Sequence, residues 1–160
     1  MAGDGEGFWQ FSCDLYARQG VEEALLALQD EDGLDVPILL FCVYAAARGV
    51  ALSDGLQVEM TPIGKAWGEE VIAPLRAARR GLKRVAPESA LRTEVKRLEL
   101  DAEQAMHVAL EALLPANGAA AGEVRMLAQE NLASWLASRN LAVAEGRRSR
   151  FAVLIAQAFP

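Results

Sequence analysis

Alanine and leucine dominate this chain. Ala (30) and Leu (22) supply 52 of the 160 residues, whereas Val, Ile and Thr together supply 18. Ala and Leu favour helices, and β-branched residues favour strands. The composition therefore predicts an all-α fold and excludes a β-sandwich, a β-barrel and a Rossmann-type sheet. A chain of this length buries about 70% of its unfolded surface in one domain, so we expect one compact helical bundle.

Apolar residues recur at helical spacing in six or seven segments. We expect helices over residues 8–16, 21–30, 36–49, 62–85, 87–114, 123–139 and 148–158. Residues 49–60 are rich in Gly, Ser and Asp, which predicts a connecting loop. Pro74 should kink or divide the helix around it. Residues 115–122 are interpreted as a flexible connection to the C-terminal helices at 123–160. All of these segments belong to one domain, residues 1–160.

The formal net charge of −6 is unevenly distributed. Residues 1–60 carry eleven acids and two bases, residues 61–100 carry nine bases and five acids, and residues 101–160 carry five bases and six acids. An acidic first third and a basic middle can pair with each other, or one of them can meet a partner of opposite charge.

Five bases form a stripe within the predicted helix 62–85. They fall within about 140° of one helix face at 100° per residue, and no acid lies three or four positions away in the same helix. In the next helix, by contrast, Glu94 with Arg97 and Lys96 with Glu99 have the spacing of pairs on a solvated face. The stripe consists of Arg76, Arg79, Arg80, Lys83 and Arg84.

Three interpretations of the stripe compete. The bases can pair with acids of the first third, can engage an acidic protein partner, or can hold a phosphorylated small molecule or nucleic acid through arginine forks. The net charge opposes nucleic acid, and no aromatic residue interrupts residues 76–84. The acids in question are Asp30, Glu31, Asp32 and Asp35.

Catalytic and metal-binding motifs do not stand out. The serines lie outside GxSxG and SxxK settings, and no phosphate-binding glycine motif appears. The single histidine, His107, follows Glu103 by four residues without a second such pair, so we interpret it as a helix-flank residue rather than a ligand. Cys13 and Cys42 are interpreted as buried free thiols. We predict no metal and no cofactor, and an enzyme is the weaker alternative.

Aromatic residues are spread over several helices. Most should lie in the core, and the alternative is a ligand pocket lined by Trp9, Tyr44 and Trp67. The first residues resemble no signal or transit peptide, and the longest apolar run, residues 36–47, is shorter than the ~20 residues of a membrane span. We therefore expect a cytoplasmic protein that does not enter the membrane.

Several ordered motifs resemble an uncharacterised family of small helical proteins, catalogued as a domain of unknown function and found mainly in proteobacteria. The motifs are FWxF at residues 8–11, GVxxALLxLQD at 20–30, Trp67, and PLRxxRRxLK at 74–83. The resemblance spans about residues 8–103 and implies a bacterial, cytoplasmic, helical protein. It assigns no catalytic or binding residue.

The sequence thus favours a small cytoplasmic binding or regulatory protein that engages an acidic protein partner through the basic stripe. The alternative is an enzyme or carrier that holds a phosphorylated or carboxylated metabolite through the same arginines. The apolar C-terminal helix can dock on its own domain or on a second copy of the chain.

Overall fold

The computed structural model describes residues 7–116 and 123–160, and within them it contains helices and no strand. The all-α prediction is therefore confirmed. The helices are α1 (Phe8–Tyr16), α2 (Val21–Asp32), α3 (Val36–Ala47), α4 (Asp54–Ile63), η1 (Gly64–Ile72), α5 (Ala73–Val85), α6 (Ala90–Glu111), α7 (Val124–Ser138) and α8 (Glu145–Ala158). Most of the predicted flexible connection, residues 117–122, lies outside the described residues.

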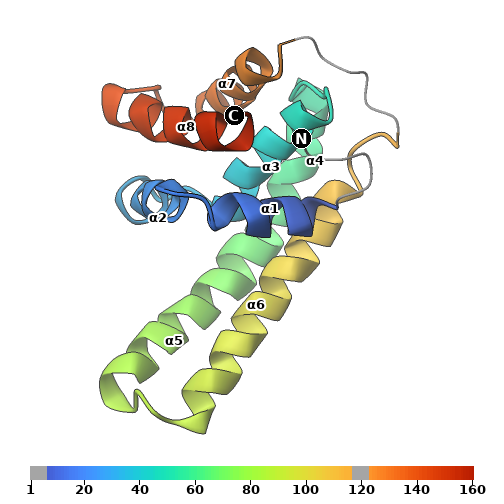
Figure 1. Cartoon of the computed structure of the whole chain (residues 1–160). Helices are drawn as coiled ribbons and strands as arrows, with labels where there is room; N and C mark the ends of the chain where they lie inside the picture. The colour runs from blue at the N-terminus through green and yellow to red at the C-terminus, as the bar shows by residue number, and fades with distance from the viewer. Residues whose placement is uncertain (1–6, 117–122) are drawn as a thin grey trace.

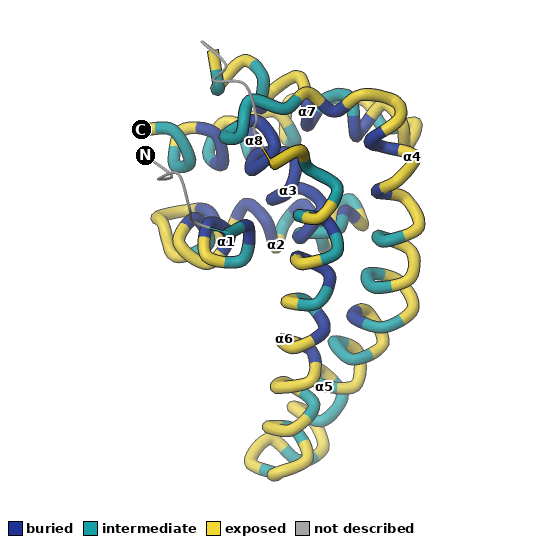
Figure 2. Tube along the Cα trace, turned by 90° about the vertical axis from the view of Figure 1, so that its right-hand side faces the viewer, coloured by how far each residue is buried: buried dark blue, intermediate teal, exposed yellow. Residues whose placement is uncertain are grey.

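Helix α3 forms the centre of the fold. Its sequence is apolar around the whole circumference, so it can be stable only when covered on all sides. Every residue from Pro37 to Ala46 is buried. Helix α3 packs against α1, α2, α6, α7 and α8, with α7 covering it most extensively, and the dark-blue segments in Figure 2 gather around it.

Helices α4, η1 and α5 follow one another without a break, so the described residues contain seven helices if these three count as one. The predicted loop at residues 49–60 is wrong from residue 54 onward. The Ser53 hydroxyl accepts a hydrogen bond from the Leu56 amide at 3.2 Å and caps a helix there. Leu56 and Met60, four residues apart, are buried, and this packing outweighs the low helix propensity of the segment.

Pro74 neither ends nor divides the long helix. A proline inside an α-helix removes one hydrogen bond and crowds the carbonyl four residues earlier. Here the nine residues of η1, immediately before α5, have the wider π-helical geometry. The departure from α geometry is therefore spread over the turns that precede Pro74, and the chain stays helical to Val85.

Helices α5 and α6 pack side by side and extend away from the remaining helices (Figure 1). Helix α5 contains no fully buried residue, and the outer part of the pair is mostly exposed (Figure 2). By contrast, α8 buries Phe151, Leu154 and Ile155 against α1, α2, α3 and α7. Of the two alternatives for the C-terminal helix, docking on its own domain is what the structure shows.

The two cysteines differ in exposure. Cys42 is buried and Cys13 is exposed, and both are free, so the expectation of two buried thiols is wrong for Cys13.

None of the helices in the described parts of the chain has both the length and the apolarity that crossing a bilayer needs.

Candidate functional site

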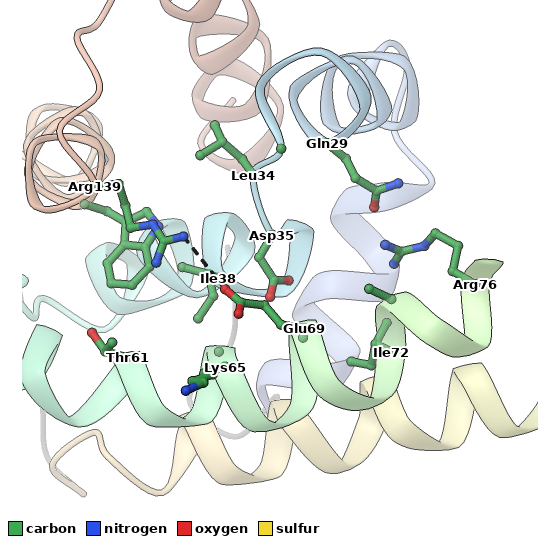
Figure 3. A pocket seen from close by; sticks show the side chains of 15 residues that line it. Gln29, Leu34, Asp35, Ile38, Thr61, Lys65, Glu69, Ile72, Arg76 and Arg139 are labelled. Atoms are coloured by element: carbon green, nitrogen blue, oxygen red, sulfur yellow. Dashed lines mark ion pairs between the residues drawn. The ribbon is translucent and has the colours of Figure 1, made fainter.

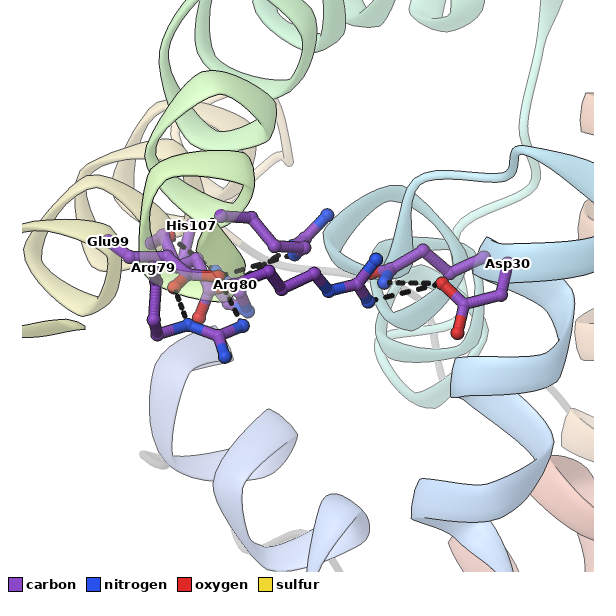
Figure 4. Close-up of polar contacts among 8 residues, drawn as sticks. Asp30, Arg79, Arg80, Glu99 and His107 are labelled. Carbon is purple, nitrogen blue, oxygen red and sulfur yellow. Dashed lines mark hydrogen bonds and ion pairs between the residues drawn. The ribbon is translucent and has the colours of Figure 1, made fainter. Parts of the chain in front are cut away.

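The inner half of the basic stripe is joined to α6. Arg76 donates through Nε to Glu99 at 3.2 Å and through Nη2 to Glu103 at 3.5 Å. Arg79 also donates to Glu99, through both Nε and Nη2 (Figure 4). Glu99 is only 6% exposed, and its carboxylate is compensated by two guanidinium groups, as a buried charge requires.

The expected pairing of Glu99 with Lys96 is therefore wrong. Glu99 lies three residues before Ala102 and seven before Met106 on the buried face of α6, so it points toward α5 rather than toward solvent. The Glu94–Arg97 pair is confirmed, with Oε1 and Nη2 2.5 Å apart. Spacing alone cannot distinguish these two acids, because the face that α5 covers decides between them.

The outer half of the stripe has weaker connections. Arg80 reaches Asp30 of α2 at 3.3 Å, and both side chains are about half exposed (Figure 4), so the pair contributes little to stability. This contact confirms one pairing between the stripe and the acidic first third. Lys83 and Arg84 form no ion pair or side-chain hydrogen bond with any residue that the structure describes.

The other acids of the first third have different partners. Asp32 accepts a hydrogen bond from Arg147 of α8 at 2.9 Å, and Glu31 lies 2.7 Å from Arg150 on the same helix. These contacts fasten α2 to α8. Of Asp30, Glu31 and Asp32, only Asp30 forms an ion pair with a base of the stripe.

We call residues 83–97 the hairpin tip, because they form the outer end of α5, the turn that follows and the outer half of α6 (Figure 1). The hairpin tip contains five bases and two acids, in a chain of net charge −6. Two apolar side chains are exposed beside the bases: Val85 is 79% exposed and Leu91 is 60% exposed. The hairpin tip is thus a basic surface with apolar spots.

A cavity of about 330 Å³ lies at the other end of α5. It is bounded by the start of α3, by η1 and by the end of α7. Its charged lining residues are Asp35, Lys65, Glu69, Arg76 and Arg139. In Figure 3 the side chain of Asp35 points from the start of α3 toward η1, where Glu69 reaches toward the same space.

The carboxylate of Asp35 has no partner among the described residues. Asp35 is the residue before α3, yet its side chain makes no capping hydrogen bond. Burial raises the pKa of Asp35 to about 6; the positive charge of Arg76 opposes the rise, and the negative charges of Glu103 and Glu69 add to it. A carboxylate whose pKa is perturbed in a cavity is typical of functional sites.

Glycines of η1 make room for this carboxylate. A Cβ atom on Gly68 would collide with the Asp35 carboxylate, whereas a Cβ on Gly64 would meet Ile38 at an ordinary distance of 3.6 Å. Gly64, Lys65, Gly68 and Glu69 all line the cavity. π-Helical turns occur frequently at functional sites, and here the π-helical segment forms one wall of the cavity.

The three aromatic residues predicted for a pocket lie elsewhere. Tyr44 is buried and stacks on Phe8 with 5.1 Å between ring centroids, and Trp9 meets the edge of His107 at 4.9 Å. Trp67 is partly buried against the core. The tryptophan that lines the cavity is Trp135, for which the sequence indicated only a place in the core.

His107 is a buried structural residue rather than a helix-flank residue. Its Nδ1 lies 2.7 Å from the Glu103 carbonyl oxygen, and its Nε2 lies 3.0 Å from the Ser12 hydroxyl. Burial lowers the pKa of His107, which keeps the ring neutral. Ser12 and His107 are 4% and 3% exposed, so this Ser–His pair is inaccessible to a substrate.

The fold and the site define a small all-α protein with a projecting basic helical hairpin and a charged cavity beside a π-helix. The chain belongs to the family described as "Protein of unknown function (DUF2390)", whose model matches residues 7–110. The match includes α1 to most of α6, and therefore both halves of the stripe, Asp35 and Gly68. No curated protein and no solved structure matches the chain.

Proposed function

We propose that this protein is a cytoplasmic binding or regulatory protein that engages an acidic, partly apolar surface of a protein partner through the hairpin tip. The observation that supports the proposal is charge: five bases and two acids lie in the hairpin tip of a chain whose net charge is −6. Local charge of this kind steers an oppositely charged partner to one face and suppresses other orientations.

Lys83 and Arg84 are the bases that we expect to make the contact. Both are exposed, and neither forms an ion pair within the described chain. They lie in the last turn of α5, where the helix dipole favours positive charge. Arg76 and Arg79, by contrast, hold α5 against α6 through Glu99.

The exposed apolar side chains of the hairpin tip favour a partner surface that is partly apolar as well as acidic. Val85 directly follows the two bases, and Leu91 begins the facing part of α6. Single exposed apolar residues are common on proteins, and these two matter here because they lie next to the bases of the hairpin tip. A partner surface that places carboxylates around a small apolar patch would match both the charge and the exposed carbon of the hairpin tip.

The alternative is an enzyme or carrier that holds a phosphorylated or carboxylated metabolite through the same arginines. Of the five bases in the stripe, Arg76 lines the cavity. Its guanidinium already donates to Glu99 and Glu103, so an anionic ligand would compete with two carboxylates for it. This arrangement favours the protein partner over the anionic metabolite.

A binding experiment with matched charge reversals tests the proposal. The wild-type chain, the double variant Lys83→Glu with Arg84→Glu, and the control Arg148→Glu are each used to retain proteins from a cell extract. Arg148 is an exposed base of α8 without an ion pair among the described residues, so its reversal changes net charge away from the hairpin tip. Arg76 and Arg79 are unsuitable for reversal, because their loss would expose Glu99 unpaired.

The proposal expects a protein that the wild type and Arg148→Glu retain, that the double variant loses, and that moderate salt releases. The binding segment of the recovered protein should be acidic, and a peptide of that segment should compete. Retention by all three chains, or loss from Arg148→Glu as well, would contradict the proposal.

A further inference from the structure

The cavity beside η1 is lined by the carboxylate of Asp35. Asp35 lies at the start of the central helix α3, and its oxygens contact Gly68 of η1 rather than a hydrogen-bond donor. No residue in the described ranges donates to it or forms an ion pair with it. Asp35 is partly buried, and a carboxylate that is partly desolvated is stabilised by a hydrogen-bond donor or a cation.

The other charged groups around Asp35 already have partners, with one exception. Arg76 is engaged by Glu99 and Glu103 of α6, and Arg139 lies 4.0 Å from Glu69 (Figure 3). Lys65 forms no ion pair with the described residues, and its side chain is exposed at the rim. No positively charged group of the described residues therefore lies within ion-pair distance of the Asp35 carboxylate, although Arg76 and Arg139 act on it from further away.

We propose that this cavity binds a small molecule that carries a protonated primary amine, with the ammonium group donating hydrogen bonds to the Asp35 carboxylate. An ammonium group has three donors and no acceptor, and an ionised carboxylate accepts on two oxygens. Charge-assisted hydrogen bonds of this kind are stronger than neutral ones. A second carboxylate, that of Glu69, lines the same cavity, but Arg139 lies 4.0 Å from it, so the attraction for a cation comes chiefly from Asp35.

The walls of the cavity suit the remainder of such a molecule. Ile38, Ile72 and Trp135 supply apolar surface, and Gln29 and Thr61 supply polar groups. The volume of about 330 Å³ lies at the lower end of the range for small-molecule sites. Gly64 and Gly68 leave two positions of the η1 wall without side chains, and the Asp35 carboxylate lies against the second of them.

The negative charge that an amine would meet in this cavity is that of Asp35, because Glu69 lies 4.0 Å from Arg139, and Arg76 is engaged by Glu99 and Glu103. The amine site is therefore separate from the hairpin tip, both in position and in the charge of what it binds. Failure of one proposal leaves the other intact.

Backbone amide spectra of the full chain test the site directly. Propylamine and 1,4-diaminobutane are titrated into the wild type, into Asp35→Asn and into the control Glu94→Gln, which neutralises an exposed carboxylate on α6. Butyrate and 1-propanol serve as the anionic and neutral probes. The amide signals of Asp35, Ile38 and Gly68 report on the cavity, and unfolding curves confirm that each variant is folded.

We expect both amines to give saturable shifts at these three amides in the wild type and in Glu94→Gln, and butyrate and 1-propanol to give none. Asp35→Asn should bind the amines at least about tenfold more weakly, because it loses a charge-assisted interaction. Saturable binding should also strengthen as the pH rises through about 6, where Asp35 ionises, and Asp35→Asn should lack this dependence.

The proposal is overturned if neither amine shifts the cavity amides of the wild type, or if the shifts follow butyrate. Equal amine affinity in the wild type and in Asp35→Asn would overturn it as well. Because Asp35→Asn keeps the shape of the side chain and removes only its charge, a loss of binding by this variant cannot come from a changed cavity volume.

Discussion

The Asp35 carboxylate lies directly against the Cα of Gly68, at a distance that leaves no room for a side chain on that residue. Asp35 precedes the central helix α3, and Gly68 is in the middle of η1. The contact therefore sets how closely the long helix approaches the core. Glycine at position 68 is required for space, since its backbone is helical and needs no unusual φ angle.

Replacement of Gly68 by alanine should destabilise the fold. In an exposed helix, Gly→Ala raises stability by about 1 kcal/mol, but here the added methyl group collides with Asp35, and overpacking of this kind costs about 1–3 kcal/mol. We expect Gly68→Ala to have a net lower free energy of unfolding, measured by chemical denaturation. Gly81→Ala in α5 is the matched control and should be stabilising, because its Cβ meets only the end of Arg84 at 3.9 Å.

The collision can be separated from other effects of the alanine by a double variant. In an Asp35→Ala background the obstacle is gone, so Gly68→Ala should become stabilising by up to about 1 kcal/mol. An equal loss of stability from Gly68→Ala in both backgrounds would show that the Asp35 contact is not the cause.

Neutralising Asp35 should stabilise the protein at neutral pH. The pKa of Asp35 is about 6 in the folded chain and 3.8 as the ordinary value, so the folded state binds more protons than the unfolded state between these pH values. The free energy of unfolding of the wild type should therefore fall as the pH rises from about 4 to 6 and then remain level. At pH 7, Asp35→Asn should exceed the wild type by on the order of 1–3 kcal/mol.

The difference in free energy of unfolding between the wild type and Asp35→Asn isolates the contribution of Asp35. Burial also raises the pKa of Glu103 and lowers that of His107, but both groups are present in both chains, so their slopes largely cancel. The advantage of Asp35→Asn should shrink as the pH falls toward 4 and disappear below about pH 3, where Asp35 is protonated in both the folded and the unfolded state. A difference that does not change between pH 4 and 7 would rule out titration of this carboxylate as its origin.

Much of the fold could be predicted from residue pattern because helix propensity and apolar spacing act locally. The fully apolar segment at residues 36–47 predicts a helix covered on all sides, and α3 is that helix. The prediction of a loop at residues 54–60 was wrong for a physical reason. Ser53 caps a helix there, and Leu56 and Met60 are buried in the core, which the composition of the segment does not indicate. The continuity through Pro74 depends on the π-helical turns before it, which residue spacing does not indicate.

The site was less predictable because it depends on which helix covers which face. Five bases on one face were correctly located in a helix, but the division into an inner, paired half and an outer, unpaired half is set by Glu99 of α6. The cavity joins residues from three distant segments of the sequence. The available signals were Asp35 after Gly33 and the four-residue spacing of Gly64 and Gly68, and their meaning appears only when α3 meets η1.

Glu99 should be the most sensitive charged residue of the α5–α6 pair. Glu99→Gln removes the carboxylate that forms ion pairs with both Arg76 and Arg79. Removing one partner of a buried ion pair costs about 3 kcal/mol. Glu94→Gln is the matched control on the same helix. It disrupts an exposed pair with Arg97 and should leave the free energy of unfolding almost unchanged. Similar losses in the two variants, measured by urea denaturation, would contradict the assignment of Glu99 as a buried anchor.

We expect α7 to be integral to the fold, although the family match ends at residue 110. Substitution of Asn131 tests this. Asn131 is 2% exposed. Its amide nitrogen donates to the carbonyls of Cys42 and Val50 at 3.1 and 3.0 Å, and its Oδ1 accepts from the Leu52 amide at 2.9 Å. This single side chain therefore joins α7 to the end of α3 and to the segment that leads into α4.

Asn131→Ala leaves the Leu52 N–H and the Val50 carbonyl without this partner, and each unsatisfied group costs about 1–3 kcal/mol; the Cys42 carbonyl stays within the hydrogen-bond ladder of α3. We expect a loss of at least about 2 kcal/mol in the free energy of unfolding, with hydrogen exchange accelerated at the Leu52 amide. Gln129→Ala, an exposed position of α7 two residues earlier, is the control and should change neither quantity. If the exchange rate at Leu52 is the same in both variants, Asn131 does not fasten α7 to the core, and the central helix must depend on apolar contacts alone for its cover.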